Sequence, residues 1–305
     1  MLEKFAILFD YNNHRILVKG LEVDENPPRL FAKIVWNGWW GRQLRRTDNP
    51  RQFATIDKGK QIVVFEISEN QGKWLKKLVF PTISEGDGKI FDFHCLRTKS
   101  KSGKSLILYL TSKGLIRLIS FDSEFEAEGA QAVKQLDKEP VVCEHFLDLS
   151  ADDKEQGMTL AVEGSGKRFV VQTKNSVDKA YKLYFFNLTE APFEDIEGED
   201  SHSDHLAMEL KASFNFLQLN KEMAQAMCFI PSFEGRCLFL TVGSGMEYSY
   251  QVFNYDEEKE EIVYCPNMSD QVNGSGFCFS VRRCEENFVY SLDSKGELSR
   301  WVIKD

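Results

Sequence analysis

Two residues near the middle of the chain are of types that could do nucleophilic chemistry. Cys143 and His145 are two positions apart, and two such residues on a β-strand face the same side, so a thiolate and an imidazole could cooperate there. Cysteine is, however, among the residue types most often buried, and a lone histidine near the start of a sheet is more often held by hydrogen bonds within the fold. We therefore interpret this pair as structural.

Two short sequences contain parts of a phosphate-binding loop. Gly-Lys-Ser stands at 103–105, and Gly-Ser-Gly-Lys stands at 164–167. A Walker motif also needs a glycine five positions before the Gly-Lys pair and a helix after it. Thr98 and Ala161 occupy those earlier positions, and a strand-like apolar run follows Ser105. We interpret both sequences as turns and expect no nucleotide to bind them.

The segment from Glu190 to His205 holds seven acidic residues and no lysine or arginine. His202 and His205 could be drawn with Asp200 and Asp204 as a metal site, but their spacing fits no helix and zinc prefers a defined set of four ligands. The segment also has too few apolar residues to offset the entropy of ordering it. We predict a flexible acidic loop inserted at 190–205, with no metal and no cofactor.

The stretch from 36 to 51 concentrates residue types that favour binding. Three of the five tryptophans and four arginines fall within these sixteen positions, and Asp48 is the one acid among them. Tryptophan and arginine dominate the centres of protein interfaces. An alternative interpretation packs the tryptophans beneath the first sheet, and contact with nucleic acid is a third. The candidate partner-binding residues are Trp36, Trp39, Trp40, Arg42, Arg45, Arg46 and Arg51.

Five stretches predict the β-hairpins that must position these residues. Each runs from an apolar strand through a small polar turn into an alternating strand that ends in Phe or Trp. Four of them begin at Thr55, Tyr109, Val171 and Thr241, and the fifth ends the chain at 293–305. Hairpins recurring roughly every 50 to 70 residues predict a radial repetition of small antiparallel sheets, which is a β-propeller.

At these residues the chain resembles WD40-like β-propellers, whose inner hairpin often reads Ser-x-Asp-Gly followed by an alternating strand and Trp-Asp. Trp301 stands at the tryptophan position, while the Trp-Asp dipeptide itself and the Gly-His pair that opens each blade are absent. Phenylalanines occupy the equivalent position in the other hairpins, namely Phe65, Phe121, Phe186 and Phe253. The resemblance implies an all-β fold of four-stranded antiparallel blades.

The number of blades depends on one further hairpin. Strand-like stretches at 143–150 and 158–164 predict a hairpin that would bring the total to seven, whereas six or fewer remain if these strands belong to neighbouring sheets. We predict seven blades, with six as the alternative. The hairpin at 5–20 precedes any complete repeat, so we expect residues 1–20 to pair with the strands of 277–304 and close a single domain spanning 1–305.

Composition limits the partners and the compartment. The formal net charge of −9 disfavours nonspecific wrapping of nucleic acid or binding to an anionic membrane, although it leaves room for a local basic patch. No apolar run approaches the roughly 18 residues of a membrane span, and the N-terminal one is too short for a signal peptide. We expect a cytoplasmic or nuclear protein whose seven cysteines are reduced.

The expected function is that of a binding module. The sequence contains no nucleophile elbow and no His-Glu-x-x-His helix, so we do not expect an enzyme. Propellers carry variable loops on rigid sheets, which favours a non-catalytic scaffold or adaptor that binds other proteins in a multiprotein complex. The alternative is a non-catalytic propeller subunit of an RNA- or DNA-acting enzyme complex, for example a tRNA-modifying one. The stretch at 36–51 is the feature in its favour.

Overall fold

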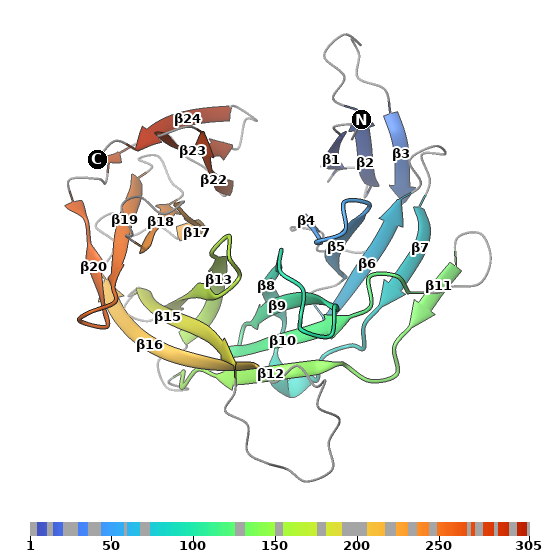
Figure 1. Ribbon diagram of the computed structural model, residues 1–305, viewed down its shortest axis with the longest axis horizontal. Helices are drawn as coiled ribbons and strands as arrows, with labels where there is room; N and C mark the ends of the chain where they lie inside the picture. The colour runs from blue at the N-terminus through green and yellow to red at the C-terminus, as the bar shows by residue number, and fades with distance from the viewer. Residues whose placement is uncertain are drawn as a thin grey trace. The chain divides into compact units, whose positions relative to one another are not determined.

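The computed structural model of the chain is built almost entirely of β-strands (Figure 1). It describes residues 5–10, 15–20, 30–35, 44–57, 60–67, 74–125, 132–149, 155–175, 181–190, 206–216, 224–230, 237–243, 249–266, 270–271, 277–283, 286–292 and 298–303. Within these ranges no helix has the length and apolar character that crossing a membrane requires. The chain separates into two compact units, Met1–Leu108 with Leu118–Val141 and Tyr109–Arg117 with Val142–Asp305, and each is described by itself.

The first unit contains the first two sheets, and the third sheet has residues of both units. The first sheet has the strand order β1-β2-β3 and consists of β1 (Phe5–Asp10), β2 (Arg15–Gly20) and β3 (Leu30–Val35). The second sheet has the order β11-β7-β6-β5-β4 and consists of β4 (Leu44–Arg46), β5 (Gln52–Asp57), β6 (Gln61–Ile67), β7 (Trp74–Val79) and β11 (Ala132–Gln135). The third sheet has the order β12-β10-β9-β8 and consists of β8 (Ile90–Cys95), β9 (Ser105–Thr111), β10 (Leu115–Phe121) and β12 (Val141–Phe146).

The second unit holds the remaining sheets. The fourth has the order β13-β14-β15-β16 and consists of β13 (Glu155–Val162), β14 (Arg168–Asn175), β15 (Tyr181–Glu190) and β16 (Leu206–Phe216). The fifth has the order β17-β18-β19-β20, with β21 (Asp270–Gln271) also pairing with β19, and its other strands are β17 (Ala224–Phe229), β18 (Cys237–Gly243), β19 (Ser249–Asp256) and β20 (Glu261–Tyr264). The last has the order β22-β23-β24 and consists of β22 (Phe277–Arg283), β23 (Glu286–Leu292) and β24 (Leu298–Ile303).

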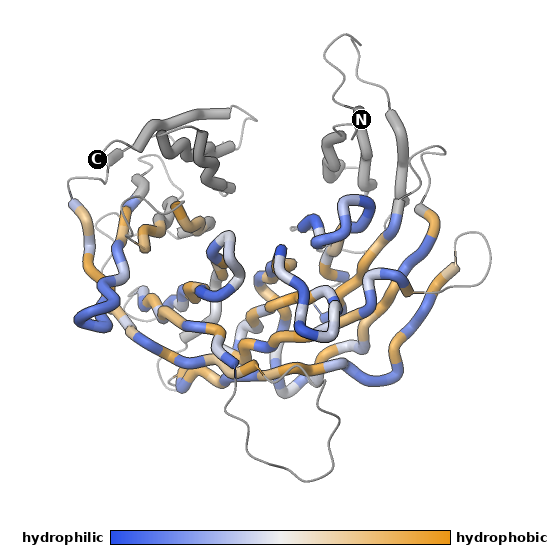
Figure 2. Tube along the Cα trace, in the orientation of Figure 1, coloured by the Kyte–Doolittle hydropathy of each residue, from blue (hydrophilic) through white to orange (hydrophobic). Residues whose placement is uncertain are grey.

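All five predicted hairpins form. They are the pairs β5–β6, β9–β10, β14–β15, β18–β19 and β23–β24. Among the hairpin strands that Figure 2 colours by hydropathy, hydrophobic residues are frequent, and the described turns between them are largely hydrophilic. Polar turn residues reverse the chain, and apolar runs such as those of β5 and β9 are buried on both faces. Local pattern therefore determined these units correctly.

The further hairpin at 143–150 and 158–164 does not form. The first stretch lies largely in β12, which pairs with β10 in the third sheet, and the second lies largely in β13, which pairs with β14 in the fourth. The two strands therefore end one sheet and begin the next, because each finds its hydrogen-bond partner in a neighbouring hairpin. The described strands fall into six sheets, and the prediction of seven blades loses the hairpin on which it depended.

One strand departs from the expected antiparallel pattern. β11 pairs with β7 in parallel, with Ala132 opposite Lys76 and Gln135 opposite Val79. The pairing continues past the strand, because the Leu136 amide donates to the Val79 carbonyl at 2.9 Å. The chain then passes to β12, where the Ser120 amide donates to the Pro140 carbonyl at 3.0 Å. The stretch 132–140 thus adds a fifth strand to one sheet on its way to the edge of the next.

Paired phenylalanines recur at one position of the repeat. In the second, fourth and fifth sheets a phenylalanine of the second strand lies opposite one of the third strand in the register, as Phe53–Phe65, Phe169–Phe186 and Phe239–Phe253. The rings stack with centroids 5.3, 4.8 and 5.5 Å apart respectively. All six side chains are buried. The phenylalanines identified from the sequence at the tryptophan position of the repeat are therefore repeated core residues.

The sheets of the second unit pack through their faces. Phe185 of the fourth sheet stacks on Tyr255 of the fifth with ring centroids 3.9 Å apart, and it also meets Phe229 and Phe239. These residues belong to one buried cluster that draws on both sheets. The first strands of consecutive sheets, β13, β17 and β22, contact one another in order, as do the last strands β16 and β20. Such packing of sheet on sheet is expected of consecutive propeller blades.

Two expectations concern the ends of the chain and the acidic segment. The N-terminal hairpin gains β3 as a third strand, so it is part of a sheet of its own, and its pairing with 277–304 stays a prediction. The acidic segment lies outside the described residues except for Glu190, which ends β15 opposite Leu206 at the start of β16. The segment therefore joins two neighbouring strands of one sheet.

Candidate functional site

The structure describes part of the predicted partner-binding stretch. Trp36, Trp39, Trp40 and Arg42 lie outside the described residues. The stretch 36–43 connects β3 of the first sheet to β4 of the second. Arg45, Arg46 and Arg51 are described, on β4 and on the turn that follows it.

Arg45 is engaged inside the fold. Its Nε–H donates to the Phe93 carbonyl at 3.3 Å, and its guanidinium lies 3.5 Å from Oδ1 of Asp92. The Asp92 side chain is only 3% exposed, against 27% for Arg45. Because Arg45 lies on β4 and Asp92 and Phe93 lie on β8, the arginine links the second sheet to the third. Its position indicates a structural role beside any role in binding.

The turn after β4 is held by its own polar groups. The Thr47 amide donates to the Gln52 carbonyl at 3.1 Å, and the Gln52 amide donates to the Asn49 carbonyl at 3.0 Å. The Arg51 amide donates to Oδ1 of Asn49 at 3.0 Å, the local side-chain contact that makes asparagine a common turn residue. This arrangement leaves the side chains of Arg46 and Arg51 exposed at either end of the turn.

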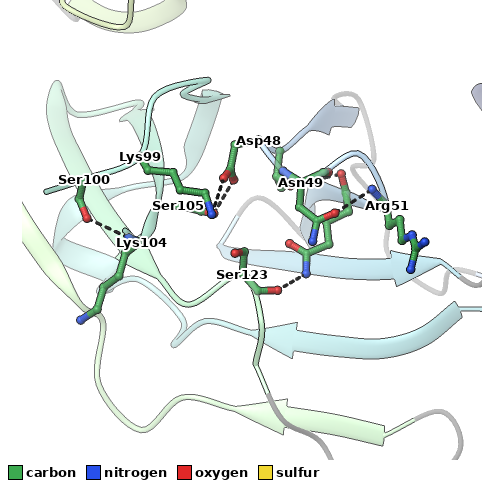
Figure 3. Close-up of polar contacts among 10 residues, drawn as sticks. Asp48, Asn49, Arg51, Lys99, Ser100, Lys104, Ser105 and Ser123 are labelled. Atoms are coloured by element: carbon green, nitrogen blue, oxygen red, sulfur yellow. Dashed lines mark hydrogen bonds and ion pairs between the residues drawn. The ribbon is translucent and has the colours of Figure 1, made fainter. Parts of the chain in front are cut away.

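Asp48 joins this turn to a second one that is distant in sequence (Figure 3). Its Oδ1 accepts a hydrogen bond from the Ser105 hydroxyl, and its Oδ2 lies 3.6 Å from Nζ of Lys99. The Asp48 side chain is 6% exposed. The one acid of the stretch 36–51 therefore faces inward, where an ammonium group and a hydroxyl compensate its burial.

The second turn, residues 97–104, is the Gly-Lys-Ser region that has parts of a phosphate loop. The Ser100 amide donates to the Lys104 carbonyl at 2.9 Å, and the Gly103 amide donates to the Ser100 carbonyl at 2.9 Å. Gly103 has φ 81°, a conformation that glycine adopts without steric cost. Strand β9 begins directly afterwards at Ser105. The interpretation as a turn, made from the sequence, is confirmed.

We call residues 46–51 and 97–104 together the two-turn basic surface. They carry six basic residues and one acid, namely Arg46, Arg51, Arg97, Lys99, Lys101 and Lys104 against Asp48. The sequence reasoning found the first turn and missed the second as a candidate site. The sequence signal that could have identified the second turn is four basic residues and no acid within the eight positions 97–104.

The surroundings of Cys143 and His145 agree with their interpretation as structural residues. The His145 ring packs edge-on against Phe186 with centroids 5.0 Å apart, and burial lowers the pKa of the imidazole. Burial, together with the neighbouring Glu144 charge, raises the pKa of the Cys143 thiol to about 12. A thiol with this pKa is almost wholly protonated at neutral pH, and the thiolate is the nucleophilic form.

The described residues include possible metal ligands. No three His, Cys, Asp or Glu side chains among them gather where they could hold a metal ion, and His202 and His205 fall outside the described ranges. Five of the described cysteines take part in no disulfide, namely Cys95, Cys143, Cys228, Cys237 and Cys265. Burial raises the pKa of the Cys237 thiol to about 11, against the opposing effect of the adjacent Arg168 guanidinium.

Comparison with known proteins identifies the fold. No protein-family model and no curated protein sequence matches the chain. Among solved structures, the β-propeller domain of Cps50 (Swd1) from Myceliophteria thermophila superposes with a TM-score of 0.55 at 11% identity, covering 96% of this chain and 78% of that one. A candidate 6-phosphogluconolactonase from Bacteroides uniformis gives 0.56 at 13% identity, covering 98% and 82%. The Dos1 propeller gives 0.50 at 12%, covering 97% and 64%. These likenesses, with the repeated sheets, show that the chain has an all-β, propeller-type fold.

Proposed function

We propose that this chain is a WD40-like β-propeller that serves as a non-catalytic scaffold or adaptor and binds other proteins in a complex, in the cytoplasm or nucleus. The observation that carries the proposal is the two-turn basic surface. It follows directly on the tryptophan-rich connection 36–43, in a chain with a net charge of −9. Exposed arginines close in sequence to tryptophans are the composition that interface centres favour.

We further propose that the propeller has six blades and is closed by its ends. Six sheets of described strands support this number. The two terminal sheets have three strands each, and the other four have four or five. A three-stranded terminal sheet leaves edges that pairing between the ends of the chain would cover.

The chemistry of the described cysteines supports a role in binding over catalysis. The thiols of Cys95 and Cys143, both of whose pKa values are raised to about 12 chiefly by burial, are poor nucleophiles at neutral pH. At 11–13% identity the structural neighbours indicate the fold and carry no activity over to this chain.

The second candidate function is a subunit of an RNA- or DNA-acting enzyme complex. The four basic residues of the turn 97–104, added to the arginines of 46–51, favour it, because clustered lysines and arginines are the electrostatic footprint of nucleic-acid binding. The salt dependence of retention on immobilised RNA separates the two candidates, since each phosphate contact releases counterions.

Two double variants test the proposal. Trp39→Ala with Trp40→Ala removes the aromatic side chains, and Arg46→Glu with Arg51→Glu reverses the exposed charges beside them. Partner capture with quantitative mass spectrometry should lose the same proteins in both variants. Lys113→Glu with Lys167→Glu changes the net charge as much as the arginine variant does, on exposed positions of two other turns, and should retain these proteins.

Thermal unfolding of each variant distinguishes tryptophans that form a binding surface from tryptophans that belong to the core. If the tryptophans pack beneath a sheet, their removal leaves cavities that cost roughly 3 to 5 kcal/mol each, and the tryptophan variant will melt far below the wild type. An unchanged melt with lost partners supports the proposal. An unchanged melt with every partner retained in both variants rejects it.

A further inference from the structure

The two-turn basic surface presents its positive charge outward and its negative charge inward. Arg46, Arg51, Arg97, Lys99 and Lys101 are exposed, and Lys104 is partly exposed. Asp48 is only 6% exposed, and its carboxylate contacts Nζ of Lys99 and the Ser105 hydroxyl (Figure 3). Among the charged side chains of these two turns, the basic ones are therefore more exposed than the single carboxylate.

The contacts of Asp48 hold the two turns in one place. Residues 48 and 105 are 57 positions apart and are joined by a side-chain hydrogen bond. On the outer side of the second turn, the Lys104 amide donates to the Ser100 hydroxyl at 3.0 Å. Because both turns are fixed by internal bonds, little ordering of the backbone is needed when a ligand binds, and a preorganised site loses less entropy on binding.

The two-turn basic surface is bordered by acidic residues on one side. The Gln52 side chain donates to the Ser123 carbonyl at 2.5 Å and to the Glu66 carboxylate at 3.3 Å. Ser123 is flanked by the exposed acids Asp122 and Glu124. These acids limit the basic area on the side of β5. On that side, the described basic area ends at the two turns.

This extent favours a short anionic chain over a long one. Nucleic acid carries one negative charge per nucleotide along its whole length, so a bound strand would pass beyond the two turns and meet a chain of net charge −9. A short segment feels the local field, because exposed charges are screened beyond roughly 8 Å at physiological salt. Neither turn contains an aromatic residue on which a base could stack.

We propose that the two-turn basic surface binds an acidic segment of a partner protein, in which several carboxylates lie close together in sequence. The inference rests on the scaffold function proposed above and specifies the chemistry of what it holds. The ammonium groups of Lys99, Lys101 and Lys104 meet carboxylates as point charges, while Arg46 and Arg51 offer paired N–H donors that match a carboxylate.

Fluorescence anisotropy with the full-length protein and a labelled octaglutamate peptide tests the proposal. The wild type should bind, and binding should weaken as salt rises from about 50 to 300 mM because the charges are exposed. Lys101→Glu with Lys104→Glu should weaken binding about tenfold or more, since two attractions become repulsions. The double variant Lys113→Glu, Lys167→Glu changes the net charge equally on other turns and should bind within about twofold of the wild type.

A variant that removes the two charges without reversing them, Lys101→Gln with Lys104→Gln, is a milder test of the same surface. The melting temperature of each variant is measured to show that it is folded. An intermediate loss in this variant supports the surface. Three results overturn the inference: no binding of octaglutamate by the wild type, equal losses in the two glutamate double variants, or tighter binding of an oligouridine of equal charge that the Lys101/Lys104 variant abolishes. The last result would assign the surface to nucleic acid.

The outcome is separable from that of the proposed function. If the wild type binds the peptide through this surface but captures no partner, the scaffold function fails and the binding chemistry stands. If the Lys101/Lys104 glutamate variant captures every partner of the wild type while losing the peptide, an acidic segment is not what the partner presents. The scaffold function then stands on the tryptophan-rich connection alone.

Discussion

The ion pair between Arg45 and Asp92 should stabilise the fold, which bears directly on how the candidate surface is tested. Arg45→Met keeps the apolar stem of the side chain and removes its charge and its donors. Asp92, 3% exposed, then keeps a buried carboxylate that has lost its guanidinium partner 3.5 Å away. The Phe93 carbonyl loses a donor at 3.3 Å as well.

The magnitude follows from burial. Removing one partner of a fully buried pair costs roughly 3 to 5 kcal/mol, because the remaining charge is uncompensated. Arg45 is 27% exposed, so water screens part of the interaction. The Phe93 amide still donates to Oδ1 of Asp92 at 2.8 Å and compensates part of the remaining charge, so about 2 to 4 kcal/mol is expected. At about 2 to 4 °C per kcal/mol for a domain of this size class, the melting temperature should fall by about 5 to 15 °C.

Urea and thermal unfolding followed by circular dichroism measure the effect. A double-mutant cycle with Asp92→Asn isolates the coupling, which should be about 2 kcal/mol. Lys259→Met is the control, because Lys259 is 66% exposed and pairs with Asp256 at the surface, and its unfolding midpoint should match the wild type. An Arg45→Met protein that melts within about 1 °C of the wild type would refute the reasoning and return Arg45 to the set of surface residues.

Three further outcomes are expected. Gly114→Ala should destabilise the protein by about 1 to 2 kcal/mol more than Gly103→Ala in urea unfolding. Both glycines have φ above +80°, but only at position 114 would the new Cβ lie 2.7 Å from a Leu149 methyl group. Equal losses of stability in the two variants would contradict this packing. Burial lowers the pKa of His145, so the unfolded chain binds the proton more tightly. The stability from this group is present above the unfolded pKa of about 6.5 and lost as pH falls below it, and His145→Gln should flatten the pH dependence of the unfolding midpoint between pH 7.5 and 5.5. Replacing 191–205 with a short Gly-Ser linker should leave the melting temperature within a few degrees and remove the preferred site of limited proteolysis; a large loss would show that the acidic segment packs.

Local pattern was enough for the hairpins and for the positions of several core residues. An apolar run and an alternating run on either side of a polar turn predict the strands β5 and β6. The position of Phe65 near the end of β6 predicts that its side chain is buried. The turn at Gly103 follows from glycine chemistry and from the apolar run that begins at Ser105. All of these depend on residues within about a dozen positions of one another, where period and turn residues are informative.

Sheet membership was decided at longer range. The stretches that became β12 and β13 look like two arms of one hairpin, because each alternates and a polar segment lies between them. Each instead pairs with a strand of a different sheet. β11 likewise joins β7 in parallel across more than fifty residues. The hydrophobic pattern of a strand indicates that the strand has a buried face. It does not indicate which neighbouring strand it pairs with, because the pattern is the same at the edge of any sheet.

The candidate surface shows the same division. The sequence by itself determined that tryptophans and arginines concentrate in 36–51 and that four basic residues stand in 97–104. Only the tertiary structure decided that Asp48 turns inward to Ser105 and Lys99, and that Arg45 reaches Asp92 and Phe93. A charged side chain is a binding group or a structural one according to what lies across from it. In this protein the residues across from it are separated by about fifty positions of chain, and folding alone brings them together.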